Sequence, residues 1–298
     1  MRFRFAEHNS RWLASALIGV TFAGSARAAG FPDETYAVLP CRPTIACTAD
    51  LVPPGSVEIE TGYLRRKLPG DAGVAHTLPL LLKLSILHDV QLQLATNTAY
   101  SSVRGRQRAF DDLAAGVKVR LIRQTSDAPA FGLSLLYDEL AVPGFEARAR
   151  GGQLTAYVTK DFGWLHVDLN LAVNLWWIAG DPATQRGAAL AFSTTLGRGF
   201  GVMAEGYVFS SAAPVGPKDG GLLGALTYAP MPYLMFDVGG DVGLFPSSRA
   251  YSVFAGLTVI LVDLWDELRG EPRASDAAPS RSRAARAWNT SRLAPPPG

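Results

Sequence analysis

The sequence predicts an all-β protein, an antiparallel transmembrane β-barrel of the outer-membrane type with about twelve strands. Three observations favour this fold class. Successive stretches after residue 56 alternate apolar and polar residues with a period of two, which is typical of strands. No helical pattern lies between these stretches, so neighbouring strands are expected to pair antiparallel. The chain also begins with an export signal.

The export signal occupies residues 1–28, where a basic head precedes an apolar run at 12–24 and then the small-residue stretch Ala26-Arg27-Ala28. This three-part layout is typical of a secretory signal peptide, with cleavage after about Ala28. An N-terminal membrane anchor is the alternative. Beyond this segment no apolar run reaches the about 18 residues of a transmembrane helix, so none is expected.

Composition and cysteine usage narrow the function classes further. The net charge of the 298 residues is only +2, which excludes wholesale electrostatic binding of nucleic acid. The two cysteines, Cys41 and Cys47, are predicted to form a disulfide, because export leads to an oxidising compartment. A metal site is the alternative and would need more His or Cys ligands nearby, so neither a metal nor a cofactor is expected. Residues 29–55 are read as an irregular periplasmic segment and a candidate plug of the lumen.

The barrel itself is predicted to span residues 56–262. In the stretch 164–177, Leu169 and Leu171 belong to an apolar set, whereas Asp168 and Asn170 belong to a polar set. The same alternation predicts strands at 57–66, 76–87, 89–100, 111–122, 130–140, 152–162, 164–177, 187–196, 200–209, 221–228, 233–245 and 249–262. Residues 263–298 are rich in Pro, Ala, Ser and Arg and are predicted to form a disordered tail. Contact of the tail arginines with anionic lipid or cell wall is the alternative.

The connections between these strands are predicted to alternate between short and long. The long ones are expected at 67–73, 101–109, 141–151, 178–186, 210–220 and 246–250. Outer-membrane barrels have short periplasmic turns at one end and long external loops at the other. Aromatic residues of the apolar parity also fall at the two strand ends, as expected for two membrane interfaces. They are Phe131, Phe162, Phe200 and Tyr228 at the turn end, and Tyr63, Tyr137, Trp177 and Tyr251 at the loop end.

The polar parity contains many ionisable residues, and burying them in a dry protein core would be prohibitive unless all were paired. A hydrated lumen on one side and lipid on the other fits better. The candidates for lumen-lining selectivity residues are Glu58, Glu60, Lys118, Arg120, His166, Asp168, Glu205, Asp237 and Asp241. The alternative role of each is a structural salt bridge or hydrogen bond within the lumen.

Three stretches carry a family resemblance: "LVPPGSVEIETGY" at Leu51–Tyr63, "TLPLLLKLSILHDVQLQL" at Thr77–Leu94 and "DDLAAGVKVRL" at Asp111–Leu121. They resemble the bacterial outer-membrane transporter family of the MetA pathway of phenol degradation, over about Leu51 to Val262. The resemblance implies an outer-membrane barrel with an uptake role and transfers no binding residues. Many outer-membrane barrels end on an aromatic residue that the assembly machinery recognises. This chain differs because it continues beyond the last predicted strand, past residue 262.

The leading functional hypothesis is a passive channel for small solutes, hydrophobic or aromatic ones included, in the outer membrane of a Gram-negative bacterium. Eight-stranded barrels have an interior filled by side chains, sixteen-stranded barrels have an open pore, and a twelve-stranded barrel is intermediate in width. Rings of charged residues in the lumen would set the selectivity of such a channel. The expected partners are the solute, outer-membrane lipid and lipopolysaccharide, and the assembly machinery.

Two alternatives belong to other classes. The first is a structural or surface-binding barrel whose loop arginines contact lipopolysaccharide phosphates. The alternative is that these arginines are simply solvated loop residues. They are Arg104, Arg106, Arg108, Arg148 and Arg150. The second is a lipid-modifying enzyme, which needs a nucleophile and a positioned base. His166 and Asp168 could pair, but no Gly-x-Ser-x-Gly motif accompanies them. The protein is therefore predicted not to be an enzyme.

Overall fold

A computed structural model describes residues 37–70, 73–103, 106–141, 148–211 and 216–261. The predicted signal peptide and C-terminal tail lie outside these residues. Every element in the described ranges is a strand, and none of these residues forms a helix long and apolar enough to cross a membrane. The strands are β1 Val57–Lys67, β2 Val74–Leu87, β3 Val90–Val103, β4 Arg106–Arg108, β5 Asp112–Ile122, β6 Ala130–Ala141, β7 Arg148–Asp161, β8 His166–Ile178, β9 Asp181–Gly197, β10 Phe200–Phe209, β11 Asp219–Met231, β12 Leu234–Gly243 and β13 Tyr251–Leu261.

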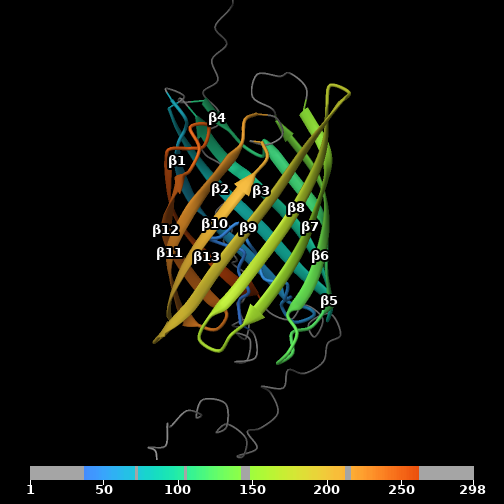
Figure 1. Ribbon diagram of the computed structural model, residues 1–298, viewed down its shortest axis with the longest axis vertical. Helices are drawn as coiled ribbons and strands as arrows, with labels where there is room; N and C mark the ends of the chain where they lie inside the picture. Colours follow the sequence, from blue (N-terminus) through green and yellow to red (C-terminus); the bar gives the residue numbers. More distant parts are fainter. Residues whose placement is uncertain (1–36, 71–72, 104–105, 142–147, 212–215, 262–298) are drawn as a thin grey trace, which may run out of the picture. The chain divides into compact units, whose positions relative to one another are not determined.

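Twelve of these strands close into a ring (Figure 1). Each pairs antiparallel with its sequence neighbours, and β1 closes the ring by pairing with β13 from Val57↔Leu261 to Lys67↔Tyr251. The short β4 pairs only with the end of β3. Closure leaves no open edge around the ring, which is the condition for a sheet to cross lipid. The predicted twelve-stranded antiparallel barrel is confirmed.

The two faces of the wall differ as the alternation predicts. Leu135 is 64% exposed, Leu171 52% and Val238 54%, and all three point outward. Neighbouring positions point inward and are buried, although many are charged. Glu58 is fully buried, and Lys118 and Asp168 retain 2% and 7% of their exposure. An apolar exterior around a polar interior is the arrangement of a transmembrane barrel and the reverse of a soluble one.

The outward aromatics lie at both strand ends. Seven of the eight predicted belt residues are exposed, and Phe131 is half-buried. At the turn end, the rings of Phe200 and Tyr228 stack across β10 and β11 with centroids 4.6 Å apart. These belts mark the levels at which the exterior passes from lipid tails to headgroups.

The prediction of a long loop at 178–186 is wrong. Strands β8 and β9 continue pairing to Ile178↔Asp181, and a two-residue turn joins them. Ala179 and Gly180 have φ values of 53° and 101°, and positive φ at both central positions is the signature of the tight hairpin turn that matches strand twist. Pro182 made this stretch resemble a loop. It is tolerated because β10 pairs with β9 only from Gly187 onward, so one edge of β9 is free there.

Other strands also extend into stretches predicted as long loops. Strand β3 runs to Val103, β7 begins at Arg148 and β11 begins at Asp219. Hairpin pairing carries these strands past the point where apolar alternation ends, because backbone hydrogen bonds do not require an apolar face. The strict contrast between short and long connections is therefore weaker than the sequence suggested.

Candidate functional site: a polar lumen threaded by the N-terminal segment

The nine predicted lumen residues all belong to the inward face of the wall. Seven are buried, whereas Arg120 and His166 are partly exposed. Most of these side chains do not border an open central channel. They contact residues 37–56, which we call the lumen segment, or each other. The lumen segment lies inside the barrel in the half nearer the turns, where it forms the blue trace of Figure 1.

The first anchor of the lumen segment is a cluster of Glu58, Glu60 and Lys83 on β1 and β2. Lys83 Nζ lies 2.8 Å from Glu58 Oε1 and also contacts Glu60. The same ammonium donates to the carbonyl of Leu39 at 2.8 Å, and Glu58 accepts the Leu39 N–H at 2.7 Å. Glu60 accepts the N–H of Cys41 at 3.0 Å. Two carboxylates and one ammonium are thus balanced by donors from the lumen segment, as buried charges require.

The second anchor is a loop closed by the Cys41–Cys47 disulfide, which the sequence predicted. Glu205 on β10 accepts the N–H groups of Ile45 at 2.8 Å and of Ala46 at 2.7 Å. Two successive N–H groups directed at one anion form a small backbone nest. Ala46 is almost fully buried against Ala189, Ala191 and Tyr207 of the wall. The carboxylate and the apolar contact together fix the tip of the loop.

Arg42 also belongs to this loop, and its guanidinium lies 3.4 Å from Asp237 on β12. The floor beneath it is made of Gly62 on β1 and Gly256 on β13, which lie opposite each other. A Cβ atom at either glycine would come within 2.5 Å of Arg42 Nη2. The absence of side chains at these two positions is therefore what lets the guanidinium lie flat against the wall.

The third anchor holds the part of the lumen segment before β1 against β5 and β7. Lys118 donates to the Thr48 carbonyl at 2.5 Å, and its ammonium lies 4.3 Å from the ring centroid of Tyr157. Thr159 accepts the Ala49 N–H at 2.7 Å and donates to Asp168 at 2.5 Å. The predicted residues Lys118 and Asp168 are thus joined to the lumen segment directly and through Thr159.

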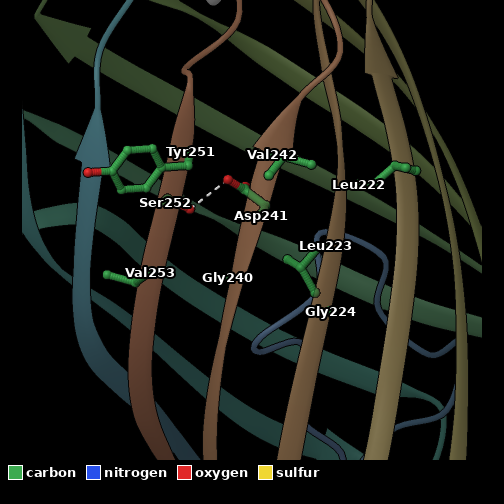
Figure 2. Close-up of a pocket in the computed structure, with 9 residues that line it drawn as sticks. All are labelled: Leu222, Leu223, Gly224, Gly240, Asp241, Val242, Tyr251, Ser252 and Val253. Carbon is green, nitrogen blue, oxygen red and sulfur yellow. Dashed lines mark hydrogen bonds between the residues drawn. The ribbon is translucent and has the colours of Figure 1, made fainter.

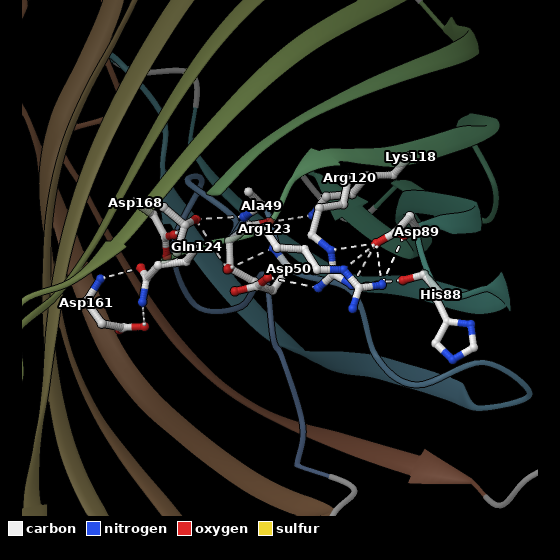
Figure 3. A network of polar contacts seen from close by, with 12 residues as sticks. Ala49, Asp50, His88, Asp89, Lys118, Arg120, Arg123, Gln124, Asp161 and Asp168 are labelled. Carbon is white, nitrogen blue, oxygen red and sulfur yellow. Dashed lines mark hydrogen bonds and ion pairs between the residues drawn. The ribbon is translucent and has the colours of Figure 1, made fainter. Parts of the chain in front are cut away.

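At the turn end, Arg120 links the lumen segment to the β2–β3 turn (Figure 3). Its guanidinium lies 3.0 Å from Asp50 and 2.8 Å from Asp89. Arg123 contacts Asp89 from the solvent side at 3.0 Å. Side-chain hydrogen bonds from Arg123 and then Arg120 hold the pKa of the Asp89 carboxyl below its ordinary value. This end of the lumen segment is therefore tied to a surface ion-pair network.

His166 lies between two carboxylates at the same end of the barrel. Its Nδ1 is 2.6 Å from Asp161 and its Nε2 is 3.0 Å from Asp168. Both ring nitrogens are engaged, so neither is placed to activate a hydroxyl nucleophile. The geometry of His166 matches the lumen hydrogen-bonding alternative and gives no support to catalysis.

The half of the lumen nearer the loops holds a separate cluster around Asp241. Arg249 Nε lies 2.8 Å from Asp241 Oδ2, and Ser252 donates to Asp241 at 2.7 Å. Tyr207 donates to the same carboxylate at 3.2 Å. Figure 2 shows Asp241 and Ser252 at a shallow cavity of about 470 Å³ in the β11–β13 wall, whose lining also includes the outward residues Leu222, Val242 and Tyr251. Apolar side chains lie in this half too, among them Leu64, Leu223 and Phe254.

Sequence reasoning missed three cations that complete these clusters, Arg42, Lys83 and Arg249. Lys83 had a usable signal, because it interrupts a leucine-rich strand on the polar parity. Arg42 and Arg249 lie outside the strands, where no alternation of apolar and polar residues indicates whether a side chain points into the lumen. Asp50 and Thr159 were missed for similar reasons, since only the path of the lumen segment brings them to their partners.

No family model matches this chain, and no curated protein does. Solved barrels do align with it. An outer-membrane channel from Pseudomonas putida aligns over 78% of this chain and 100% of its own length, at 11% identity and a TM-score of 0.48. The NanC porin covers 68% of this chain and 98% of its own, at 10% identity and a TM-score of 0.47. An anion-selective porin from Comamonas acidovorans covers 69% and 98%, at 8% identity and a TM-score of 0.35.

Proposed function

We propose that the protein is a passive channel of the outer membrane and that the lumen segment controls passage through it. The observation that carries the proposal is how the lumen segment is held. Its backbone N–H groups bond to wall carboxylates such as Glu60 and Glu205, and its apolar contacts with the wall are small ones such as that of Ala46. Water can replace such contacts when a segment moves, so a hydrated path can open without exposing a dry interior.

The exterior of the barrel supports the outer-membrane location. Outward side chains in the middle of the wall are apolar, as at Leu135 and Leu171, and aromatics lie at both ends. Both ends of the barrel sequence lie at the turn end, since β1 begins and β13 finishes there. With the turns on the periplasmic side, an exported chain enters the membrane from the compartment into which it is delivered.

The solute class we propose is small molecules with an apolar or aromatic part. Near the loops the lumen combines an apolar cluster, which includes Leu64, Leu223 and Phe254, with the polar Asp241–Arg249 pair. The resemblance to the outer-membrane transporter family of the MetA pathway of phenol degradation points to the same class. A weakly binding wall of this kind suits passive diffusion, because binding must be weak enough for release.

Planar-bilayer recording of the mature full-length protein tests the proposal. Replacing Glu205 with Ala should increase conductance or open time, because it removes the acceptor of the Ile45 and Ala46 N–H groups. Gln185→Ala is the matched control, since Gln185 is inward and buried but bonds to Asn174 and Ser211 instead of the lumen segment. Absence of conductance in both the wild type and Glu205→Ala, with no solute uptake into liposomes, would contradict the proposal.

A further inference from the structure

The outward face of β13, β1 and β2 carries basic side chains at its loop end. Arg65 lies opposite Val253 on one side and His76 on the other. Lys67 lies one step nearer the loops, opposite Tyr251 and Val74. We call Arg65, Lys67 and His76 the basic patch. It is separate from the lumen, because the inward face of β1 and β2 carries the buried residues Glu58, Glu60 and Lys83 instead.

Among the residues that the structure describes, the cations of the basic patch have no carboxylate partner. The acidic residues of β1, β12 and β13 are Glu58, Glu60, Asp237 and Asp241, and all four are buried on the inward face. Among the described residues no carboxylate oxygen lies within 4.0 Å of Arg65 or Lys67. The outward arginines of β7 differ, because Arg148 and Arg150 contact Glu139 at 2.8 and 3.5 Å. Within the described residues, Arg65 and Lys67 therefore keep their positive charges without a carboxylate, whereas Glu139 offsets part of the charge of Arg148 and Arg150.

Two tyrosines hold the basic patch in place. Arg65 Nη1 donates to the Tyr251 hydroxyl at 3.2 Å, and its guanidinium lies 5.9 Å from the Tyr251 ring centroid. Tyr63 and His76 share a hydrogen bond of 2.5 Å between the phenol oxygen and Nδ1. A guanidinium has five donors, so the single bond to Tyr251 orients Arg65 and leaves donors for a ligand.

The height of the basic patch on the barrel wall indicates the chemical class of its ligand. Tyr63 and Tyr251 belong to the aromatic belt at the loop end, which lies among lipid headgroups. Leu78 and Leu80 continue the same outward face toward the middle of the wall. A ligand that meets both regions has a phosphate at the level of Arg65 and acyl chains beside the leucines.

We propose that Arg65, Lys67 and His76 form a binding site for the phosphate of a lipid headgroup in the leaflet at the loop end. In the outer membrane this lipid is the phosphorylated lipid A part of lipopolysaccharide. The proposal rests on the outer-membrane location argued above and is independent of conduction. It places the lipid contact on the β13–β1–β2 face. Arg148 and Arg150, which were predicted to lie in a loop, are on β7 and contact Glu139.

The test is binding of fluorescent lipid A to the detergent-solubilised full-length protein, with EDTA present to remove bridging cations. The double variant Arg65→Gln/Lys67→Gln should raise the apparent Kd about fivefold for each cation removed. Arg150→Gln is the matched control, since it removes an outward cation that already contacts Glu139. Raised salt should weaken wild-type binding and have less effect on the double variant.

Three further arms decide between outcomes. The affinity of the wild type for dephosphorylated lipid A should be as low as the affinity of the double variant for lipid A, or lower. Inorganic phosphate alone should compete only weakly with lipid A for the wild type. Equal affinities of wild type and double variant for lipid A, or equal affinities of wild type for the two lipids, would overturn the proposal. An unchanged circular-dichroism spectrum of the double variant shows that it folds. Its loss of lipid A binding then tests this proposal whether or not the protein conducts.

Discussion

Glu205 Oε2 on β10 accepts the backbone N–H of Ala46 at 2.7 Å, although 159 positions separate the two residues in the chain. Both residues are buried. A wall carboxylate therefore satisfies a donor that the lumen segment would otherwise leave unpaired, and the first prediction follows from this contact.

Replacing Glu205 with Ala should leave the N–H groups of Ile45 and Ala46 without an acceptor. The expected cost is about 1–3 kcal/mol for each unsatisfied buried donor that water does not reach. Hydrogen exchange followed by mass spectrometry should show faster exchange at residues 45–46 and little change in the strands. If Gln185→Ala produced the same acceleration, the anchor would not be specific to Glu205.

A side chain at Gly256 should displace Arg42. In Gly256→Ala the new Cβ would lie 2.5 Å from Arg42 Nη2 and 2.7 Å from the Thr61 carbonyl, and overpacking of this kind costs typically about 1–3 kcal/mol. Adding Arg42→Ala should recover part of the loss, because only the contact with the guanidinium is relieved. Denaturant unfolding of both single variants and the double variant gives the coupling. Strictly additive effects would contradict the contact.

Charges placed on the two faces of β8 should affect different properties of the protein. Leu171 is 52% exposed on the outward face, whereas its neighbour Ala172 faces the lumen. Leu171→Arg should destabilise the folded barrel in lipid by about 2–4 kcal/mol if the residue lies at the bilayer midplane. Ala172→Arg should alter conductance with a smaller effect on stability. Unfolding in lipid vesicles and bilayer recording of both variants provide the comparison.

The Asp89 network should stabilise the turn end only while its carboxyl is ionised. Because Arg123 and Arg120 lower the pKa of Asp89 in the folded protein, its contribution is present above the unfolded-state pKa. The contribution is lost as the pH falls through the folded-state pKa. Wild type should therefore exceed Asp89→Asn in thermal stability at neutral pH, and the two should converge in acid. A difference that persisted or grew in acid would contradict the role of the ionised carboxyl.

Much of the barrel follows from sequence, because alternation is a local signal that each strand carries by itself. The twelve ring strands and the inward direction of residues such as Asp168 and Glu205 were predictable for this reason. The β8–β9 turn was not, since hairpin pairing continues through Pro182, which resembles a loop residue. The partners of the lumen segment were also hidden, because Arg42 reaches Asp237 across 195 positions through tertiary structure alone.

The lumen segment has a consequence for the order of assembly. It precedes every strand in the chain, yet its partners are spread over the wall from Glu58 on β1 to Asp237 on β12. These partners face one enclosed space only after β13 has paired with β1. Until the ring closes, the lumen segment therefore lacks part of its final contacts. It becomes ordered last, when the completed ring supplies the remaining partners for a part of the chain that was synthesised first.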